Sequence, residues 1–598
     1  MKTFWKIVFG SLLGCLVAML VAMFCFFGMM SSMASASMNS GQASKTGSVL
    51  RIDKSTIISE RAVDVLSVTA LMNRQSGARL SLLDAVRAID AAADDPAIKF
   101  IYMNTDDLSW SISNAEEVRA ALARFRASGK AIVAYGENFD VLSYYVASVA
   151  DKVVANADGT AMITGIATQS IYLKDLLDKL GVEMQLIRHG KFKSAGEMYI
   201  KNAMSDENRL QLQAMVDGMW NTIADEICAS RDFSREELDA WIENLELDKT
   251  QSMLDRKMVD TIYFADQMKD YVCSLASVDK FEKVGFVSLA DYAPGRLAQV
   301  SKTKSKDKIA VLYANGEIVN DGDTEQNIVG AKFAAEIEKV RKDSTIKAVV
   351  FRVNSPGGSV QASQFVRREM ELLRAEKPVI ASYGDYAASG GYWISAESDK
   401  IFCDNTTLTG SIGVFSLVPN LGSAAKKTLS VNVESVTSHA HGDMMRGMRS
   451  LDAAEQEYMQ KSIEDVYDEF LTIVSGGRNM TKDMVDDIAQ GRVWCGCDAF
   501  GVGLADEKGG LVDAIAYAAD LVGLADYKLV ECPASKTQME RFMEMFGGSV
   551  SMKAMLSGSE NATRWEDVQA QFERAYGFLR NADETVFCAR MPFITDIK

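Results

Sequence analysis

A serine lies between small residues in the segment 386–393, which reads YAASGGYW. The segment stands where a predicted strand gives way to a predicted helix. Small neighbours leave a substrate room to reach the Ser389 hydroxyl, and a helix N-terminus stabilises developing negative charge. Ser389 is therefore a candidate nucleophile. The structural alternative is a serine that only caps the helix, which is the commoner role at such a position.

Paired glycines follow another predicted strand, in the segment 354–359, which reads NSPGGS. Gly357 and Gly358 would let bare backbone approach a ligand and direct N–H groups toward it. Taken alone, such a segment is more often a simple turn. It is therefore a candidate ligand-binding loop whose role depends on what surrounds it.

A serine nucleophile needs a base to take its proton. The chain has only three histidines, which are His189, His439 and His441. A lysine kept neutral is the other option, and the segment 188–197, RHGKFKSAGE, contains Lys191 and Lys193. On the residues alone each lysine is expected at the surface, so the identity of the base stays open at this point. The scarcity of histidine also argues against a histidine-rich metal site.

The sequence matches itself at a constant offset of 248 residues, without gaps, from position 98 to position 152. The matches include Ile98-Lys99 with Ile346-Lys347, Tyr135-Gly136 with Tyr383-Gly384, Tyr144 with Tyr392, and Asp151-Lys152 with Asp399-Lys400. Chance does not sustain one register over such a length. We therefore predict two homologous domains in tandem, at 46–305 and 306–530. The polar stretch 301–308, SKTKSKDK, suits a surface connection between them.

The two copies differ at the positions that could carry chemistry. Shifted by 248 residues, Gly357 and Gly358 become Ser109 and Trp110, Ser389 becomes Val141, and Ser411 becomes Ile163. A turn or a cap that the fold requires should survive in both copies. Its loss from the first copy favours a chemical role for Gly358, Ser389 and Ser411 in the second.

Each copy alternates predicted strands and helices. In the second copy, residues 309–313 and 346–353 are apolar and β-branched, which is typical of buried strands. Residues 364–376 have charged and apolar side chains at helical spacing, and short strands are predicted at 379–382 and 401–403. The predicted fold class is therefore α/β, with a largely buried sheet.

Residues 7–30 carry no charge and would form about 36 Å of helix, enough to cross a hydrocarbon core of about 30 Å. Lys2 and Lys6 precede this segment, which predicts a cytoplasmic N-terminus and an extracytoplasmic body. Residues 1–45 are thus expected to form a stub, an anchor and a linker. The alternative is a cleaved signal peptide with residues 34–36, ASA, at its cleavage site, but the apolar core exceeds the usual ~7–15 residues.

A net charge of −17 and a pI near 4.9 argue against nucleic acid as a partner. Nine cysteines are scattered along the chain, and Cys495 with Cys497 forms a CxC pair. This pair could hold a metal, but two buried free thiols are the simpler interpretation. Residues 531–598 match nothing in the first half, and amphipathic helices at 538–545 and 565–580 are expected to pack against the domains or a neighbouring subunit.

The motifs NSPGGS, AASGGYW, LTGSIGV and GKFKSA together resemble those of the signal peptide peptidase A family, in its long, double-domain form. The resemblance covers nearly the whole chain and includes the N-terminal anchor. It implies tandem duplicated ClpP/crotonase-like domains built from repeated ββα units. It also implies a membrane-anchored serine endopeptidase that degrades cleaved signal peptides and other apolar peptides, without a metal or any other cofactor.

The same resemblance assigns roles to individual residues. The family's nucleophile falls on Ser389 and its general base on Lys193, while Ser411 would hydrogen-bond and orient the lysine. Burial at the contact between the domains is expected to lower the pKa of this lysine, because burial disfavours the charged form. The oxyanion and substrate-binding residues are expected to be Gly357, Gly358 and Gly390.

The resemblance further implies a homotetramer at the outer face of the bacterial inner membrane, because short single-domain relatives form rings of eight and a fused chain would close with four. Two other functions stay open, a crotonase-type acyl-CoA hydratase or isomerase and a non-enzymatic membrane scaffold. The predicted anchor argues against the first, because CoA substrates are cytoplasmic. The intact Ser389 loop argues against the second.

Overall fold

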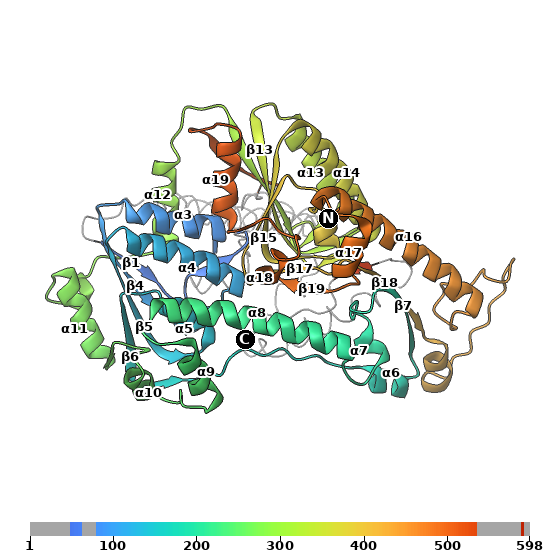
Figure 1. Ribbon diagram of the computed structural model, residues 1–598, viewed down its shortest axis with the longest axis horizontal. Helices are drawn as coiled ribbons and strands as arrows, with labels where there is room; N and C mark the ends of the chain where they lie inside the picture. Colours follow the sequence, from blue (N-terminus) through green and yellow to red (C-terminus); the bar gives the residue numbers. More distant parts are fainter. Residues whose placement is uncertain (1–47, 62–78, 535–587, 591–598) are drawn as a thin grey trace, which may run out of the picture.

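The computed structural model describes residues 48–61, 79–534 and 588–590 (Figure 1). Within these ranges no helix is long and apolar enough to cross a bilayer. The expected membrane segment at 7–30 and the expected helices at 538–545 and 565–580 lie outside the described residues. The described chain forms two large sheets, one from each half, a third sheet to which both halves contribute, and a two-stranded sheet of β2 (Ile57–Ser59) and β3 (Arg79–Ser81).

The first half is built on a six-stranded parallel sheet in the order β8-β6-β5-β4-β1-β9. Its strands are β1 (Ser48–Ile52), β4 (Ile98–Asn104), β5 (Ala131–Phe139), β6 (Lys152–Ala161), β8 (Thr261–Tyr263) and β9 (Phe286–Ser288). Successive residues of a strand point to opposite faces. Leu50 accordingly packs in the core beneath α3 (Leu82–Ala93) and α4 (Ile112–Ala127), and Val49 packs against α11 (Ala265–Ala276) on the other face.

The second half repeats this plan around the strand order β19-β17-β15-β13-β10-β21, with β16 and β20 beside β15. The strands are β10 (Lys308–Asn315), β13 (Ile346–Ser355), β15 (Val379–Ala388), β16 (Lys400–Cys403), β17 (Leu408–Gly410), β19 (Val493–Cys495), β20 (Glu507–Lys508) and β21 (Lys528–Cys532). Helices α13 (Gly330–Lys342) and α14 (Val360–Glu376) cover one face, and α19 (Leu511–Leu521) covers the other. The strands and the helix expected in this half, and the α/β fold class, are confirmed.

Equivalent side chains make equivalent contacts in the two halves. Arg126 pairs with Asp151 at 2.7 Å, and Arg374 pairs with Asp399 at 2.8 Å. The buried hydroxyls of Tyr144 and Tyr392, on α5 (Val141–Ala147) and α15 (Gly390–Trp393), each donate to a backbone carbonyl, that of Met258 and that of Leu504. The duplication inferred from the 248-residue offset is therefore present in the three-dimensional structure.

A third sheet joins the halves, in the order β12-β11-β14-β22-β18-β7. Strand β7 (Glu183–His189) of the first half runs antiparallel to β18 (Val414–Asn420) of the second along their whole length. The other members are β11 (Glu317–Val319), β12 (Asn327–Val329), β14 (Gly357–Ser359) and β22 (Cys588–Arg590). The first half therefore delivers the segment that follows β7 into the second half.

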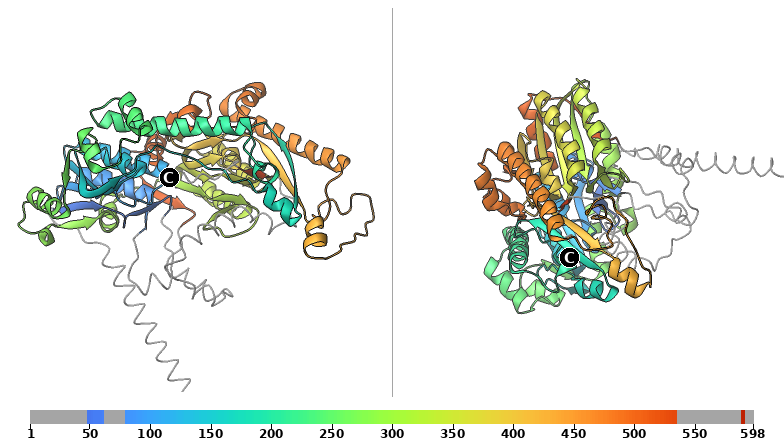
Figure 2. Two further views of the ribbon diagram at one scale, coloured as in Figure 1. Left: turned by 90° about the horizontal axis from the view of Figure 1, so that it is seen from below. Right: turned by 90° about the vertical axis from the view of Figure 1, so that its right-hand side faces the viewer.

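Helix α8 (Asp206–Ser230) also spans the two halves, running across the lower part of the view in Figure 1 and near the top of the left view in Figure 2. Ile223 and Ile227, near its C-terminal end, pack in the core of the first half. Leu212 and Met215, near its start, pack against Ala388 and Val493 of the second. Helix α16 (Ala453–Arg478) packs on β7 and β18 at the far side of the second half.

A buried ion cluster lies where the halves meet. The Arg352 guanidinium, from β13, donates to both oxygens of Glu60 and pairs with Glu117 of α4 at 2.7 Å. Burial raises the pKa of Glu117 above its usual range, and the Arg352 charge opposes that shift. Because removing one member of such a cluster leaves an uncompensated buried charge, the cluster fixes the relative position of the two halves.

Candidate active site

Ser389 lies at the junction between β15 and α15, with a positive φ of 55°. A non-glycine residue at positive φ is uncommon, and such strain concentrates at functional sites. The Ser389 side chain makes no capping hydrogen bond to α15, although its carbonyl accepts from the Trp393 N–H at 2.8 Å. The expected alternative of a plain helix cap therefore does not describe this hydroxyl, which is fully buried and directed elsewhere.

The hydroxyl of Ser389 faces the side chain of Lys193. Lys193 follows β7, and its Nζ lies 2.8 Å from Ser389 Oγ, 3.0 Å from Ser411 Oγ and 3.0 Å from the Ser411 carbonyl oxygen. All three residues are fully buried. The structure therefore brings together the three side chains singled out from the sequence, one from the first half and two from the second.

Ser411 follows β17 directly and, like Ser389, has a positive φ, here 49°. Its N–H donates to the Arg492 carbonyl at 2.7 Å, and the Ser389 N–H donates to the neighbouring Gly410 carbonyl at 2.8 Å. Both hydroxyls are thus carried on strained backbone that short hydrogen bonds hold in place. A buried amine held between two serine hydroxyls can take a proton from one while the other fixes its direction.

The glycines of the NSPGGS segment form β14, close to the site. Gly357 and Gly358 have φ values of 95° and 156°, which favour glycine. A Cβ on Gly358 would stand 2.0 Å from the Ile318 carbonyl oxygen, so no other residue fits there. Gly390 begins α15, where the first N–H groups of a helix have no intrahelical acceptor.

The backbone of β22 lies antiparallel to β14, with Gly358 opposite Ala589 and Gly357 opposite Arg590. On its other side β22 meets β18, where Cys588 lies opposite Phe415. An extended segment of this chain is therefore seated between β14 and β18, along the glycine-bearing edge of the site.

The segment 490–494, QGRVW, which also resembles the family but to which the sequence assigned no role, packs directly on Lys193. Gly491 has a φ of 80°, and a Cβ there would stand 2.6 Å from the backbone nitrogen of Lys193. The Gln490 carbonyl accepts from the Phe192 N–H at 2.9 Å, and the Gly491 N–H donates to the Ile412 carbonyl at 2.8 Å. This strap, residues 490–492, therefore ties the lysine loop to the Ser411 loop.

Gln211 of α8 is a second residue that the sequence did not single out. Its fully buried amide donates to the Phe192 carbonyl and to Ser194 Oγ, each at 3.0 Å, and accepts from the Val493 N–H at 3.2 Å. One side chain thus holds both flanks of Lys193 against the strand that follows the strap. Nothing in the local sequence of α8 distinguishes this glutamine from its neighbours, because its partners come from remote parts of the chain.

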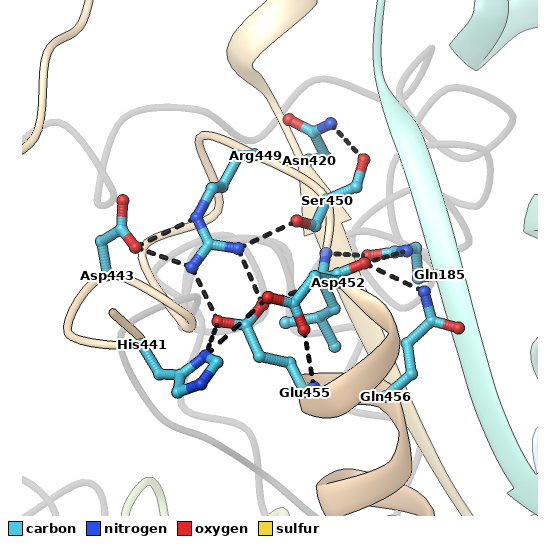
Figure 3. A network of polar contacts seen from close by, with 10 residues as sticks. Gln185, Asn420, His441, Asp443, Arg449, Ser450, Asp452, Glu455 and Gln456 are labelled. Carbon is cyan, nitrogen blue, oxygen red and sulfur yellow. Dashed lines mark hydrogen bonds and ion pairs between the residues drawn. The ribbon is translucent and has the colours of Figure 1, made fainter. Parts of the chain in front are cut away.

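The histidines make other contacts. His189 stacks on Tyr467 with ring centroids 3.9 Å apart, and His439 Nδ1 contacts Ser438 Oγ at 3.0 Å. His441 Nδ1 lies 2.9 Å from Glu455, in the polar network of Figure 3.

His441, Asp452 and Glu455 have ligand atoms within 4.8 Å of one another, which could suit a metal. However, the Arg449 guanidinium donates to both oxygens of Glu455 at 2.7 Å. The Arg449 guanidinium therefore already neutralises the Glu455 carboxylate. The polar network of Figure 3 connects the segment 441–452 to α16.

In the first half, the positions equivalent to Ser389 and Ser411 carry apolar residues, Val141 and Ile163. Val141 starts α5, where Asp140 caps the helix, and both Val141 and Ile163 are buried hydrophobic residues. The described residues of the first half therefore keep the scaffold of the Ser389 loop without its hydroxyl, as the sequence comparison of the copies predicts.

A known peptidase family matches both halves of the chain. The model of peptidase family S49 matches the chain twice, at residues 124–279 and 371–525. The first match contains Lys193, and the second contains Ser389 and Ser411.

Curated relatives align over most of both chains. The chain is 36% identical to Protease 4 of Salmonella typhi over 486 residues, covering 80% of this chain and 77% of the relative. It is 34% identical to Protease 4 of Haemophilus influenzae, covering 74% and 73%. It is 30% identical to the chloroplastic serine protease SPPA of Arabidopsis thaliana, covering 81% and 72%.

The chain has two tandem α/β domains with a buried serine between them, and its relatives are proteases. It is therefore a serine peptidase. The chain belongs to peptidase family S49. The resemblance to signal peptide peptidase A that the motifs suggested is thereby confirmed.

Proposed function

We propose that this serine peptidase uses a dyad of Ser389 and Lys193 and is an endopeptidase held in the membrane by residues 7–30. The observation that carries the proposal is the 2.8 Å contact between Lys193 Nζ and Ser389 Oγ, with both residues fully buried. Lysine must be neutral to act as a base, and burial disfavours its charged form.

In the proposed reaction, the neutral Lys193 amine takes the proton of Ser389 as Oγ attacks the scissile carbonyl carbon. The oxyanion that forms accepts hydrogen bonds from the backbone N–H groups of Gly358 and Gly390. The Lys193 ammonium then gives its proton to the leaving amine, and an acyl-enzyme remains. Water attacks this ester with the lysine again acting as base, which frees the second product and restores Ser389.

Ser411 is proposed to orient the base. Its hydroxyl and its carbonyl oxygen lie 3.0 Å from Lys193 Nζ, so they can accept two of the amine's hydrogen bonds. The lone pair of a neutral amine is then left facing Ser389. A base held in one direction accelerates proton transfer more than a freely rotating one.

The substrate is proposed to be an extended peptide that adds as a strand to β14. Support comes from β22, a stretch of this chain's own backbone seated antiparallel on Gly357–Ser359. Main-chain hydrogen bonds to a sheet edge supply affinity without demanding a particular sequence. Such binding suits a peptidase that degrades cleaved signal peptides and other apolar peptides.

The proposed location is the bacterial inner membrane, with the N-terminus cytoplasmic and the catalytic domains outside. An anchor at 7–30 would hold the site beside the bilayer, where apolar peptides gather. The proposed assembly is a homotetramer. Light scattering on anchor-deleted protein should give four times the chain mass, and a stable monomer would contradict the tetramer.

The deciding experiment is covalent labelling with a fluorophosphonate, followed by peptide mass spectrometry. We expect one phosphonylated residue, Ser389, together with hydrolysis of a fluorogenic apolar peptide by the unlabelled enzyme. An acyl-CoA hydratase or a scaffold would not acquire this label. Label absent from Ser389 in a folded wild-type protein would overturn the proposal.

A further inference from the structure

Two cysteines that the proposed reaction does not use lie at the end of β19. Cys495 is the last residue of this strand, and Cys497 lies in the short helix α18 (Gly496–Ala499). Cys495 is buried, whereas Cys497 is partly exposed. The chain turns from strand into helix between them, at Gly496.

The Cys495 and Cys497 side chains lie close enough for each to shift the pKa of the other. Both also face Gly218 of α8, where an added Cβ would stand 2.9 Å from Cys497 Sγ and 3.2 Å from Cys495 Sγ. The glycine thus leaves room in which both sulfur atoms gather. Small side-chain rotations can therefore bring the sulfurs to bonding distance, since the two residues are only two positions apart.

Their environments give the two thiols different chemical characters. The neighbouring Cys495 side chain lowers the pKa of the Cys497 thiol, so more of it is thiolate, the nucleophilic form. The neighbouring Cys497, together with burial, raises the pKa of Cys495 above its ordinary range. The Cys495 thiol also donates to the Asn405 carbonyl at 3.0 Å. A solvent-accessible thiol of lowered pKa beside a second thiol is the usual arrangement of a redox-active pair, and the partly exposed Cys497 beside Cys495 fits it.

Cys497 opens onto a cavity of about 700 Å³ between α8 and the second half. Its charged lining residues are Asp217, Asp225, Glu226, Asp498 and Lys508. Asp225 pairs with Arg235 at 2.9 Å and Glu226 pairs with Lys508 at 3.3 Å, so Asp217 and Asp498 give the cavity its net negative charge. A small molecule of positive charge is therefore drawn toward the Cys497 thiol, and an anion is repelled.

We propose that Cys495 and Cys497 form a reversible dithiol–disulfide modification site, which exchanges with small cationic disulfides that enter this cavity. The Cys497 thiolate attacks one sulfur of the small disulfide, a mixed disulfide forms, and one small thiol leaves. The Cys495 thiol then loses its proton and attacks the Cys497 sulfur, and the second small thiol leaves. One protein dithiol is oxidised while one small disulfide is reduced to two thiols, so atoms and electrons balance.

The test uses the full-length chain, reduced, freed of reductant and exposed to cystamine, a cationic disulfide. Trypsin cleaves after Arg492 and Lys508, and the resulting peptide 493–508 contains no cysteine other than these two. We expect this peptide to lose two hydrogen atoms, to resist alkylation, and to regain both thiols with dithiothreitol. A peptide that stays fully alkylated, or that carries a cysteamine on each cysteine, would overturn the proposal.

Single substitutions separate the two roles. In Cys495→Ser, Cys497 should accumulate as a mixed disulfide with cysteamine, because nothing resolves it. In Cys497→Ser, Cys495 should remain reduced over the same time, and Cys228→Ser, outside the pair, should close like wild type. An adduct on Cys495 but none on Cys497 would contradict the assigned roles.

The charge of the cavity is tested by comparing two oxidants. At low ionic strength we expect cystamine to close the pair several-fold faster than oxidised glutathione, which is anionic. Added salt should reduce the difference, because it screens the acidic lining. Equal rates for the two disulfides at low salt would contradict a role for the cavity.

Discussion

Lys193 Nζ and Ser389 Oγ lie 2.8 Å apart although 196 residues separate them in the chain. The lysine comes from the half that lacks the serine, and the serine from the half that lacks the lysine. Neither copy of the duplicated domain therefore contains the whole site.

Ser389→Ala should abolish peptide hydrolysis and fluorophosphonate labelling while leaving the fold intact. The equivalent residue in the first half is Val141, which is buried in a normally folded strand-to-helix junction, so the fold does not need the hydroxyl. Circular dichroism and thermal unfolding check the fold, and a fluorogenic peptide checks the activity. Wild-type turnover by a folded Ser389→Ala protein would mean that another residue is the nucleophile.

Lys193→Met should lower acylation at least a thousandfold, near the upper end of what a general base contributes. Wild-type activity should rise with pH, because the ammonium that prevails at low pH cannot accept the serine proton. Lys193→Arg should be equally inactive, since guanidinium does not deprotonate.

Lys191→Met is the matched control, because Lys191 lies two positions earlier and is exposed. It should keep wild-type activity and the wild-type pH profile. Activity retained in Lys193→Met but lost in His441→Ala would instead assign the base to a histidine.

Ser411→Ala should lower turnover by roughly ten- to a thousandfold, as expected when a catalytic group loses the partner that orients it. The loss should fall on the acylation rate, measured by fluorophosphonate labelling across pH, with little change in stability. Ile163 occupies the equivalent position in the first half, so the fold tolerates an apolar side chain there. Labelling at the wild-type rate at every pH would exclude the orienting role.

Ala589→Pro should raise the rate of peptide hydrolysis several-fold. Residue 589 lies opposite Gly358 in the pairing of β22 with β14, and β22 must leave before a substrate strand can take its place. Proline removes an N–H and disfavours strand pairing. Ala589→Ser retains the N–H and serves as the control with unchanged kinetics. An unchanged rate in Ala589→Pro would show that β22 does not compete with the substrate.

Arg449→Gln should destabilise the protein at neutral pH, and the difference from wild type should shrink in acid. Hydrogen bonds from Arg449 lower the pKa of Glu455 to about 2, below the reference value of about 4.3 for glutamate. The stabilisation is therefore complete above about pH 4.3 and is lost as pH falls through about 2. Urea unfolding of both proteins at pH 7 and pH 3 measures it. A difference that grows in acid would contradict the assigned pair.

Much of the site could be predicted because the first copy of the duplicated domain shows which residues the scaffold needs without the chemistry. The offset of 248 residues exposes Ser389, Ser411 and Gly358 as positions that the scaffold does not need. The base could not be chosen in this way, because Lys191 and Lys193 differ in burial and not in type. Only the family resemblance distinguished them.

The contacts that hold Lys193 could not be predicted from local patterns. Gln211 and Gly491 reach the lysine only because β7 pairs with β18 and because α8 crosses between the halves. These are long-range pairings, whereas hydrophobic periodicity reports only on single elements. The strands and helices of each half were therefore predictable, and the exchange of segments between the halves was not.

The pairing of β7 with β18 also has a consequence for the connection between the halves. This ladder, the buried Arg352 cluster and α8 hold the halves together without help from the partly exposed, polar stretch at 301–308. A chain divided between Lys304 and Ser305 should accordingly reassemble from two separately synthesised fragments, and peptidase activity should appear only on mixing. On this expectation, the continuous backbone serves only to raise the local concentration of two halves that would otherwise associate as separate pieces.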